Sequence, residues 1–413
     1  MSSGPKSHTR RLSVLIALVP IAPPLYVVGL RAVTLWRELP LLTQRILLIF
    51  IALQGLSGLF TPEPLLSVPF ALLRGAFIGA MICAGFYLGN TRAFQALLWG
   101  EIATLIIALV TTVLRHGEGF WNIRLEHPLY WPVSIGLSAA LAFLFAFVRE
   151  DFPRLLRGSL ISLSILGLLL SGSRAAQGAA VLGALVICLR LLNPRAWRRF
   201  ATSLGIAVLI SVGVSYLTPG QTAVGSGQNP IARSIDTGLD LNGRGVIWGQ
   251  AWNAFLEHPL GGVGVFQIGP SLPALMLPCK LFPPVEPFGP CPPLLEKLNG
   301  AWNIAHNVFL HGLAETGVLG LLGWLALLGF LGFAAYRCGE PLLLGLYVAF
   351  MTVNMVDNST LVPSPHYAEV FYVAMGIAVA LMSARARETR TLTAALEGVH
   401  TASPLSKPAK SHR

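Results

Sequence analysis

Hydrophobic residues gather into long runs that short polar connections separate. Eleven such runs lie at about 12–36, 45–61, 66–89, 93–114, 131–148, 157–172, 174–192, 200–217, 306–336, 341–356 and 367–384. A helix needs about 20 apolar residues to cross a bilayer. The pattern therefore predicts an all-α polytopic membrane protein.

Composition supports this class and excludes two others. Hydrophobic residues make up 54% of the 413 positions and charged residues 11%, whereas soluble domains contain about 25% charged residues. A soluble globule of this composition would expose large apolar patches, and a disordered chain would be far more polar. The net charge of +11 does not indicate nucleic-acid binding, because the basic residues follow the positive-inside rule.

The basic residues predict which connections face the cytoplasm. They cluster near both ends and in two short connections: Lys6, Arg10 and Arg11; Arg149, Arg154 and Arg157; Arg190, Arg195, Arg198 and Arg199; and Arg385, Arg387 and Arg390. Two cytoplasmic termini require an even number of spans. Prolines break helices, so we expect the first run to fold at Pro23-Pro24 into two short spans, giving about twelve spans in total. The alternative is one kinked span with a re-entrant element elsewhere.

Arg10 and Arg11 precede an apolar run without a cleavage site, which predicts a membrane segment rather than a cleavable signal.

One external connection is much longer than the others. The predicted domains are an N-terminal bundle of about eight spans (1–217), an external loop (218–305), C-terminal spans (306–384) and a polar, frayed cytoplasmic tail (385–413). Within the loop, residues 244–256 predict an amphipathic helix with Trp248, Trp252 and Phe255 on one face, a pattern that favours the membrane interface. Cys279 and Cys291 flank its proline-rich part and could form a disulfide.

Several kinds of catalytic site are missing from the sequence. It contains no P-loop motif, no Asp-x-Asp pair and no zinc-type His/Cys cluster, and only four aspartates. Asp236, Asp240 and Asp357 are the aspartates expected on the outer face, and a divalent metal prefers several oxygen ligands. We therefore expect no metal and no cofactor, and we expect arginine to bind any phosphate.

Two arginines are candidates for that role. Arg174 follows Ser171 and Ser173, either of which can cap a helix that begins near Arg174, and Gln177 shares its face. Arg244 lies in the first turn of the predicted loop helix. A helix N-terminus with a guanidinium favours anions. The alternatives are an arginine that extends to the membrane interface and an ordinary solvated arginine.

His306 opens the span after the loop and is the candidate base, since histidine can accept a proton at neutral pH. In a straight helix Glu315 lies half a turn away from His306, so we expect it to pair with His311 instead. Arg74 and Glu101 lie at similar depths in successive spans and could form a buried ion pair. Alternatively, Arg74 lines a polar cavity and contacts an anionic ligand.

Four motifs occur in an order that resembles the O-antigen ligases of the ligase/polymerase superfamily. They are Ser173-Arg174-Ala175, Gly243-Arg244 to Trp248, Pro259 to Gly264, and His306-Asn307 to Gly317. The resemblance implies a metal-independent, inverting glycosyltransferase that transfers a glycan from undecaprenyl pyrophosphate to the lipid A–core oligosaccharide. It also implies an inner-membrane protein with a periplasmic active site.

The resemblance and the charges together suggest residue roles. Arg174 and Arg244 would bind the pyrophosphate, and His306 would act as base or orient a substrate, with Gln177, Asn307, Trp248 and Arg74 in support. Asp236, Asp240 and Glu257 are the next candidate bases. The alternatives are an O-antigen polymerase, a protein O-oligosaccharyltransferase, and a transporter of lipid-linked glycans. Polar motifs on one side of the membrane only argue against transport.

Overall fold

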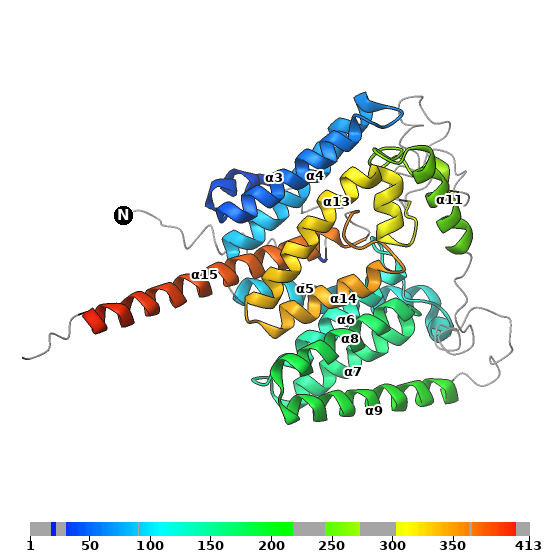
Figure 1. The fold of residues 1–413 in the computed structure, drawn as a ribbon. Helices are drawn as coiled ribbons and strands as arrows, with labels where there is room; N and C mark the ends of the chain where they lie inside the picture. The colour runs from blue at the N-terminus through cyan, green and yellow to red at the C-terminus, as the bar shows by residue number, and fades with distance from the viewer. Residues whose placement is uncertain are drawn as a thin grey trace, which may run out of the picture.

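The computed structural model describes residues 18–21, 30–89, 91–217, 244–272, 303–362 and 366–401 of the chain. The described part is helical and contains no strand. Its elements are η2 (Leu30–Glu38), α3 (Leu41–Gly58), α4 (Pro64–Leu88), α5 (Thr91–His116), η3 (Gly117–Asn122), α6 (Pro132–Val148), α7 (Arg154–Ser171), α8 (Arg174–Leu191), α9 (Pro194–Leu217), α11 (Arg244–Glu257), η4 (Gly269–Ser271), α13 (Val308–Arg337), α14 (Pro341–Asn354) and α15 (Ala368–Thr401). Most helices pack lengthwise into one bundle (Figure 1).

Ten of the eleven predicted runs correspond to helices, namely α3 to α9 and α13 to α15. In the described part, seven helical segments are long and apolar enough to cross a membrane: Leu41–Gly58, Pro64–Leu88, Phe94–Asn122, Arg154–Ser171, Arg174–Leu191, Val308–Arg337 and Ala368–Thr391. The helices α6 and α14 are apolar but shorter. The chain is thus a multi-pass membrane protein.

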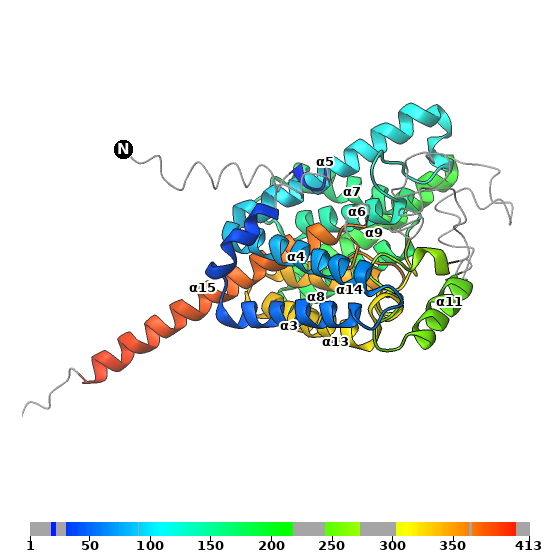
Figure 2. The ribbon, with the colours of Figure 1, turned by 90° about the horizontal axis from the view of Figure 1, so that it is seen from above.

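Some predictions fall outside the described residues. The fold at Pro23-Pro24, the Cys279–Cys291 pair, Asp236 and Asp240 lie there, so the total of twelve spans stays a prediction. The tail prediction is wrong in one respect, because α15 continues without a break past Arg385 to Thr401. Its C-terminal half projects from one end of the bundle, and α11 covers the opposite end (Figures 1 and 2).

The predicted straight helix over 306–336 is broken. Gly317 inside α13 has φ 56° and ψ −163°, and a β-carbon there would lie 2.3 Å from the backbone of Leu260. The break leaves the carbonyls of Ala314 and Glu315 free to accept the amides of Val263 and Gly264, at 2.8 and 3.0 Å. The Pro259–Gly264 motif therefore joins the segment after α11 to the middle of a membrane helix.

Candidate active site

His306 lies just before α13, where Asn307 caps the helix. The side-chain oxygen of Asn307 accepts the amides of Phe309 and Leu310, both at 3.0 Å. The Asn307 amide nitrogen donates to the carbonyl of Met355 at 2.9 Å. His306 itself has φ 48°, a conformation that residues other than glycine rarely adopt. Strained residues of this kind cluster at functional sites.

Asp357 is the charged partner of His306. Its Oδ2 lies 3.6 Å from Nδ1 of His306, and the two side chains are 7% and 36% exposed. Burial opposes ionisation of this carboxyl, but the imidazoles of His306 and His366 and the amide of Asn358 outweigh it and hold the pKa of Asp357 below its usual range. An ionised Asp357 can therefore orient the imidazole with Nδ1 toward itself.

The segment that carries Asp357 connects α14 to α15 and is itself fixed by buried polar contacts. The Asn354 side chain accepts the Ser359 amide at 2.9 Å and donates to the hydroxyl of Thr360 at 2.8 Å. The oxygen of Asn358 accepts the Leu361 amide at 3.0 Å. Because every one of these residues is buried, Asp357 sits on a rigid support.

The loop helix α11 reaches His306 through Trp248. The indole nitrogen of Trp248 donates to the carbonyl of His306 at 3.2 Å. Arg244, the first residue of α11, lies one helical turn before Trp248 and is half-buried. The predicted helix is confirmed, but its buried face is formed by Ala251 and Ala254. Trp252, in contrast, is 44% exposed.

Arg174 is the first residue of α8, and Ser173 caps that helix by accepting the Ala176 amide at 3.3 Å. One turn further along, a β-carbon at Gly178 would lie 3.7 Å from the side chain of Thr352 near the end of α14. Met355, whose carbonyl accepts the hydrogen bond from the Asn307 side chain, follows directly after α14. The end of α14 therefore connects the first turns of α8 with the His306 region. Gln177 donates to the carbonyl of Leu168 at 3.4 Å.

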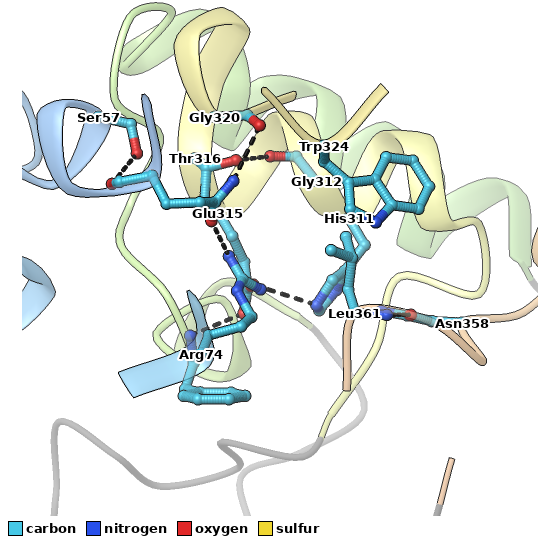
Figure 3. A network of polar contacts seen from close by, with 12 residues as sticks. Ser57, Arg74, His311, Gly312, Glu315, Thr316, Gly320, Trp324, Asn358 and Leu361 are labelled. Carbon is cyan, nitrogen blue, oxygen red and sulfur yellow. Dashed lines mark hydrogen bonds and ion pairs between the residues drawn. The ribbon is translucent and has the colours of Figure 1, made fainter. Parts of the chain in front are cut away.

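Arg74 belongs to a buried network rather than to an open cavity (Figure 3). Its Nη1 donates to Oε2 of Glu315 at 2.6 Å, and both side chains are at most 1% exposed. Its Nη2 donates to Gln54 at 3.0 Å. His311 lies 3.4 Å from the same Glu315 oxygen, which confirms the predicted His311–Glu315 pair. The predicted Arg74–Glu101 pair is wrong.

Glu315 also holds the loop, since its Oε1 accepts the Phe266 amide at 2.8 Å. Both carboxylate oxygens are thus in use inside the protein, in contacts with Arg74, His311 and Phe266 rather than with His306. Glu101 instead accepts the Ser138 hydroxyl at 2.6 Å and the Tyr367 hydroxyl at 3.1 Å. Similar depth in the membrane did not identify the neighbour of Arg74, because the partner lies on α13, which is remote in sequence.

Sequence reasoning missed Asp357 as the partner of His306. The sequence places Asp357 only among the three aspartates expected on the outer face, too few for a metal site. What could have identified Asp357 is that acidic residues are rare beside membrane helices, and one placed there needs a charged partner. The described residues contain no group of three or more His, Cys, Asp or Glu side chains able to hold a metal ion.

Comparison with known protein families gives a match to part of the chain. A model of the O-antigen ligase family matches residues 159–325, and no curated protein matches the chain. The matched segment includes Arg174, Arg244 and His306, whereas Arg74 and Asp357 lie outside it. The family indicates glycosyltransferase activity of the ligase or polymerase type, on lipid-linked glycans. The match over residues 159–325 agrees with the resemblance inferred from the motifs.

Proposed function

We propose that the protein ligates O-antigen glycan from undecaprenyl pyrophosphate onto the lipid A–core oligosaccharide, with inversion and without a metal. The site would face the periplasm from the inner membrane, with both termini in the cytoplasm. The observation that carries this proposal is the position of His306, which adjoins the ionised, buried Asp357 and is contacted by the loop helix. A partly exposed imidazole with a buried carboxylate behind it is suited to remove a proton.

The reaction follows from these positions. The hydroxyl oxygen of the acceptor attacks the anomeric carbon, and the bond from that carbon to the pyrophosphate oxygen breaks. Nε2 of His306 takes the hydroxyl proton, while Asp357 holds Nδ1 and stabilises the imidazolium. Its present 3.6 Å separation from Nδ1 is longer than a hydrogen bond, and catalytic hydrogen bonds commonly shorten when substrate binds. The leaving undecaprenyl pyrophosphate keeps the electron pair of the broken bond.

Arginines would stabilise the charge that develops on the leaving group. A guanidinium can bind two phosphate oxygens at once, and both Arg174 and Arg244 occupy the first turn of a helix, where anions are favoured. This arrangement supplies the stabilisation that a metal gives in other enzymes. Asn307 and Trp248 would keep the backbone of His306 in place. Arg74 would act only on structure, because Glu315 already neutralises it.

A purified reaction tests the proposal and separates it from its rivals. Wild-type protein would receive a polyprenyl-pyrophosphate-linked glycan with lipid A–core oligosaccharide, a second glycan or an acceptor protein. Transfer to lipid A–core supports the ligase, whereas chain extension of the glycan would establish a polymerase. Glycan attached to protein would establish an O-oligosaccharyltransferase. Movement of lipid-linked glycan across proteoliposomes without any transfer would establish a transporter.

A further inference from the structure

The connection between α5 and α6 carries a buried histidine that the proposed reaction does not use. His127 is 8% exposed, and its Nδ1 accepts the Leu129 amide at 3.1 Å. The single proton of the neutral ring therefore lies on Nε2. That nitrogen is buried and has no hydrogen-bond partner among the described residues. Burial lowers the pKa of His127 to about 4, so at pH 7 the ring is uncharged and Nε2–H is a hydrogen-bond donor.

A buried donor without an acceptor opposes folding, because its hydrogen bond to water is lost and not replaced. Such groups are few in native proteins, and each needs a reason. The orientation of His127 does not come from a loose connection. The Glu126 amide donates to the hydroxyl of Thr112 at 2.8 Å, and the Glu126 carboxylate contacts Arg115 and His116 at 2.9 and 3.0 Å.

One end of this connection packs on the turn that carries the first candidate arginine. Nε of Arg124 donates to the carbonyl of Ser171 at 2.8 Å, and the Leu125 amide donates to the carbonyl of Leu170 at 3.1 Å. Both carbonyls belong to the last turn of α7. Arg174 follows directly after this turn as the first residue of α8.

The other end of the connection packs near the carboxylate partner of the candidate base. The ring of Tyr130 lies 5.1 Å from the ring of His127 and 4.6 Å from that of Tyr367. Tyr367 directly follows His366, whose imidazole acts on Asp357. His127 therefore lies within a segment that joins the arginine end of the candidate site to its base end.

We propose that Nε2–H of His127 donates a hydrogen bond to an oxygen of the transferred sugar, the first sugar of the donor glycan. This inference rests on the proposed function. In that reaction the pyrophosphate lies at Arg174 and the acceptor hydroxyl lies at His306, so the transferred sugar occupies the space between them. An uncharged N–H group suits a hydroxyl or carbonyl oxygen of a sugar. His127 would thus help to determine which sugar is accepted.

Three substitutions separate the N–H group from the rest of the ring. His127→Phe keeps a planar ring without a donor. His127→Asn keeps an oxygen for the Leu129 amide but is too short to reach the position of Nε2, and His127→Gln is long enough to place an amide N–H there. His116→Phe is the matched control, because it removes a surface histidine, 31% exposed, that contacts the same connection through Glu126.

Equilibrium binding in phosphatidylcholine nanodiscs would be measured for a polyprenyl-pyrophosphate-linked glycan and for polyprenyl pyrophosphate without sugar. We expect His127→Phe and His127→Asn to weaken binding of the glycan-bearing lipid about tenfold, equivalent to about 1.4 kcal/mol. Binding of the sugar-free lipid should stay unchanged. His127→Gln should recover part of the loss, and His116→Phe should bind both lipids as the wild type does.

Three results would overturn the inference. One is unchanged binding of the glycan-bearing lipid by the Phe and Asn variants. Another is an equal loss for the sugar-free lipid, which would assign the hydrogen bond to the pyrophosphate. The third is an equal loss in His116→Phe, which would show that the connection acts on structure alone. Failure of the proposed function looks different, since wild-type protein would then transfer glycan to no acceptor, whereas the binding comparison would still report on the N–H group of His127.

Discussion

The buried contact between Arg74 and Glu315 makes a strong prediction for stability. One carboxylate oxygen of Glu315 accepts a hydrogen bond from Arg74 and lies near His311, and the other oxygen accepts the Phe266 amide. Glutamine can replace one of these oxygens but not both, and it leaves the guanidinium without a counter-charge. Removing one partner of a buried ion pair costs about 3–5 kcal/mol. We therefore expect Glu315→Gln to lower the free energy of unfolding by that amount.

The measurement is denaturation in mixed micelles, with two comparisons. Glu126→Gln removes the half-buried carboxylate that Arg115 and His116 share at the surface, where the Arg115 side chain is 57% exposed, and should cost less than about 1 kcal/mol. Arg74→Met combined with Glu315→Gln should be more stable than Glu315→Gln alone, because no buried charge is then left unpaired. A Glu315→Gln variant as stable as Glu126→Gln, or a double variant no better than the single one, would refute this reasoning.

Three further predictions concern the reaction. Arg174→Ala and Arg244→Ala should each lose transfer at normal expression. Lysine at either position should restore part of it, because lysine keeps the positive charge but cannot bind two phosphate oxygens at once. Transfer at the wild-type rate by both alanine variants would contradict the proposed binding of pyrophosphate by these arginines. A chelator should leave transfer intact, and loss with EDTA followed by rescue with Mg²⁺ or Mn²⁺ would disprove metal independence. Because the pKa of Asp357 lies below its usual range, its carboxylate stays ionised as the pH falls through the ordinary range of aspartate titration, and its effect is lost only at still lower pH. Asp357→Asn should therefore slow transfer at neutral pH and move the ascending limb of the pH–rate profile to lower pH, since the imidazolium loses a stabilising charge; an unmoved limb would argue against the pair.

The helices of this fold could be predicted well because a membrane leaves few alternatives to long apolar helices. The break at Gly317 could not, since apolar residues continue on both sides of it. Its cause is the docking of the Pro259–Gly264 segment, a contact between distant parts of the chain that no local pattern reveals.

The candidate site likewise combines features that local spacing predicts with contacts between distant parts of the chain that it does not predict. The N-cap at Ser173, the loop helix from Arg244 and the His311–Glu315 pair follow from local spacing, and all are present in the structure. The partners of His306 and Arg74 depend on which helices become neighbours. Depth along a span gives no information about that choice.

The most direct test of the central claim measures single-turnover transfer and donor affinity for wild-type protein and His306→Ala in the same nanodiscs. If His306 is the general base, the rate should fall by about 10²–10⁴, while donor affinity stays close to wild type because the arginines still hold the pyrophosphate. A variant that keeps its rate but binds donor much more weakly would make His306 a pyrophosphate ligand and contradict the proposed mechanism.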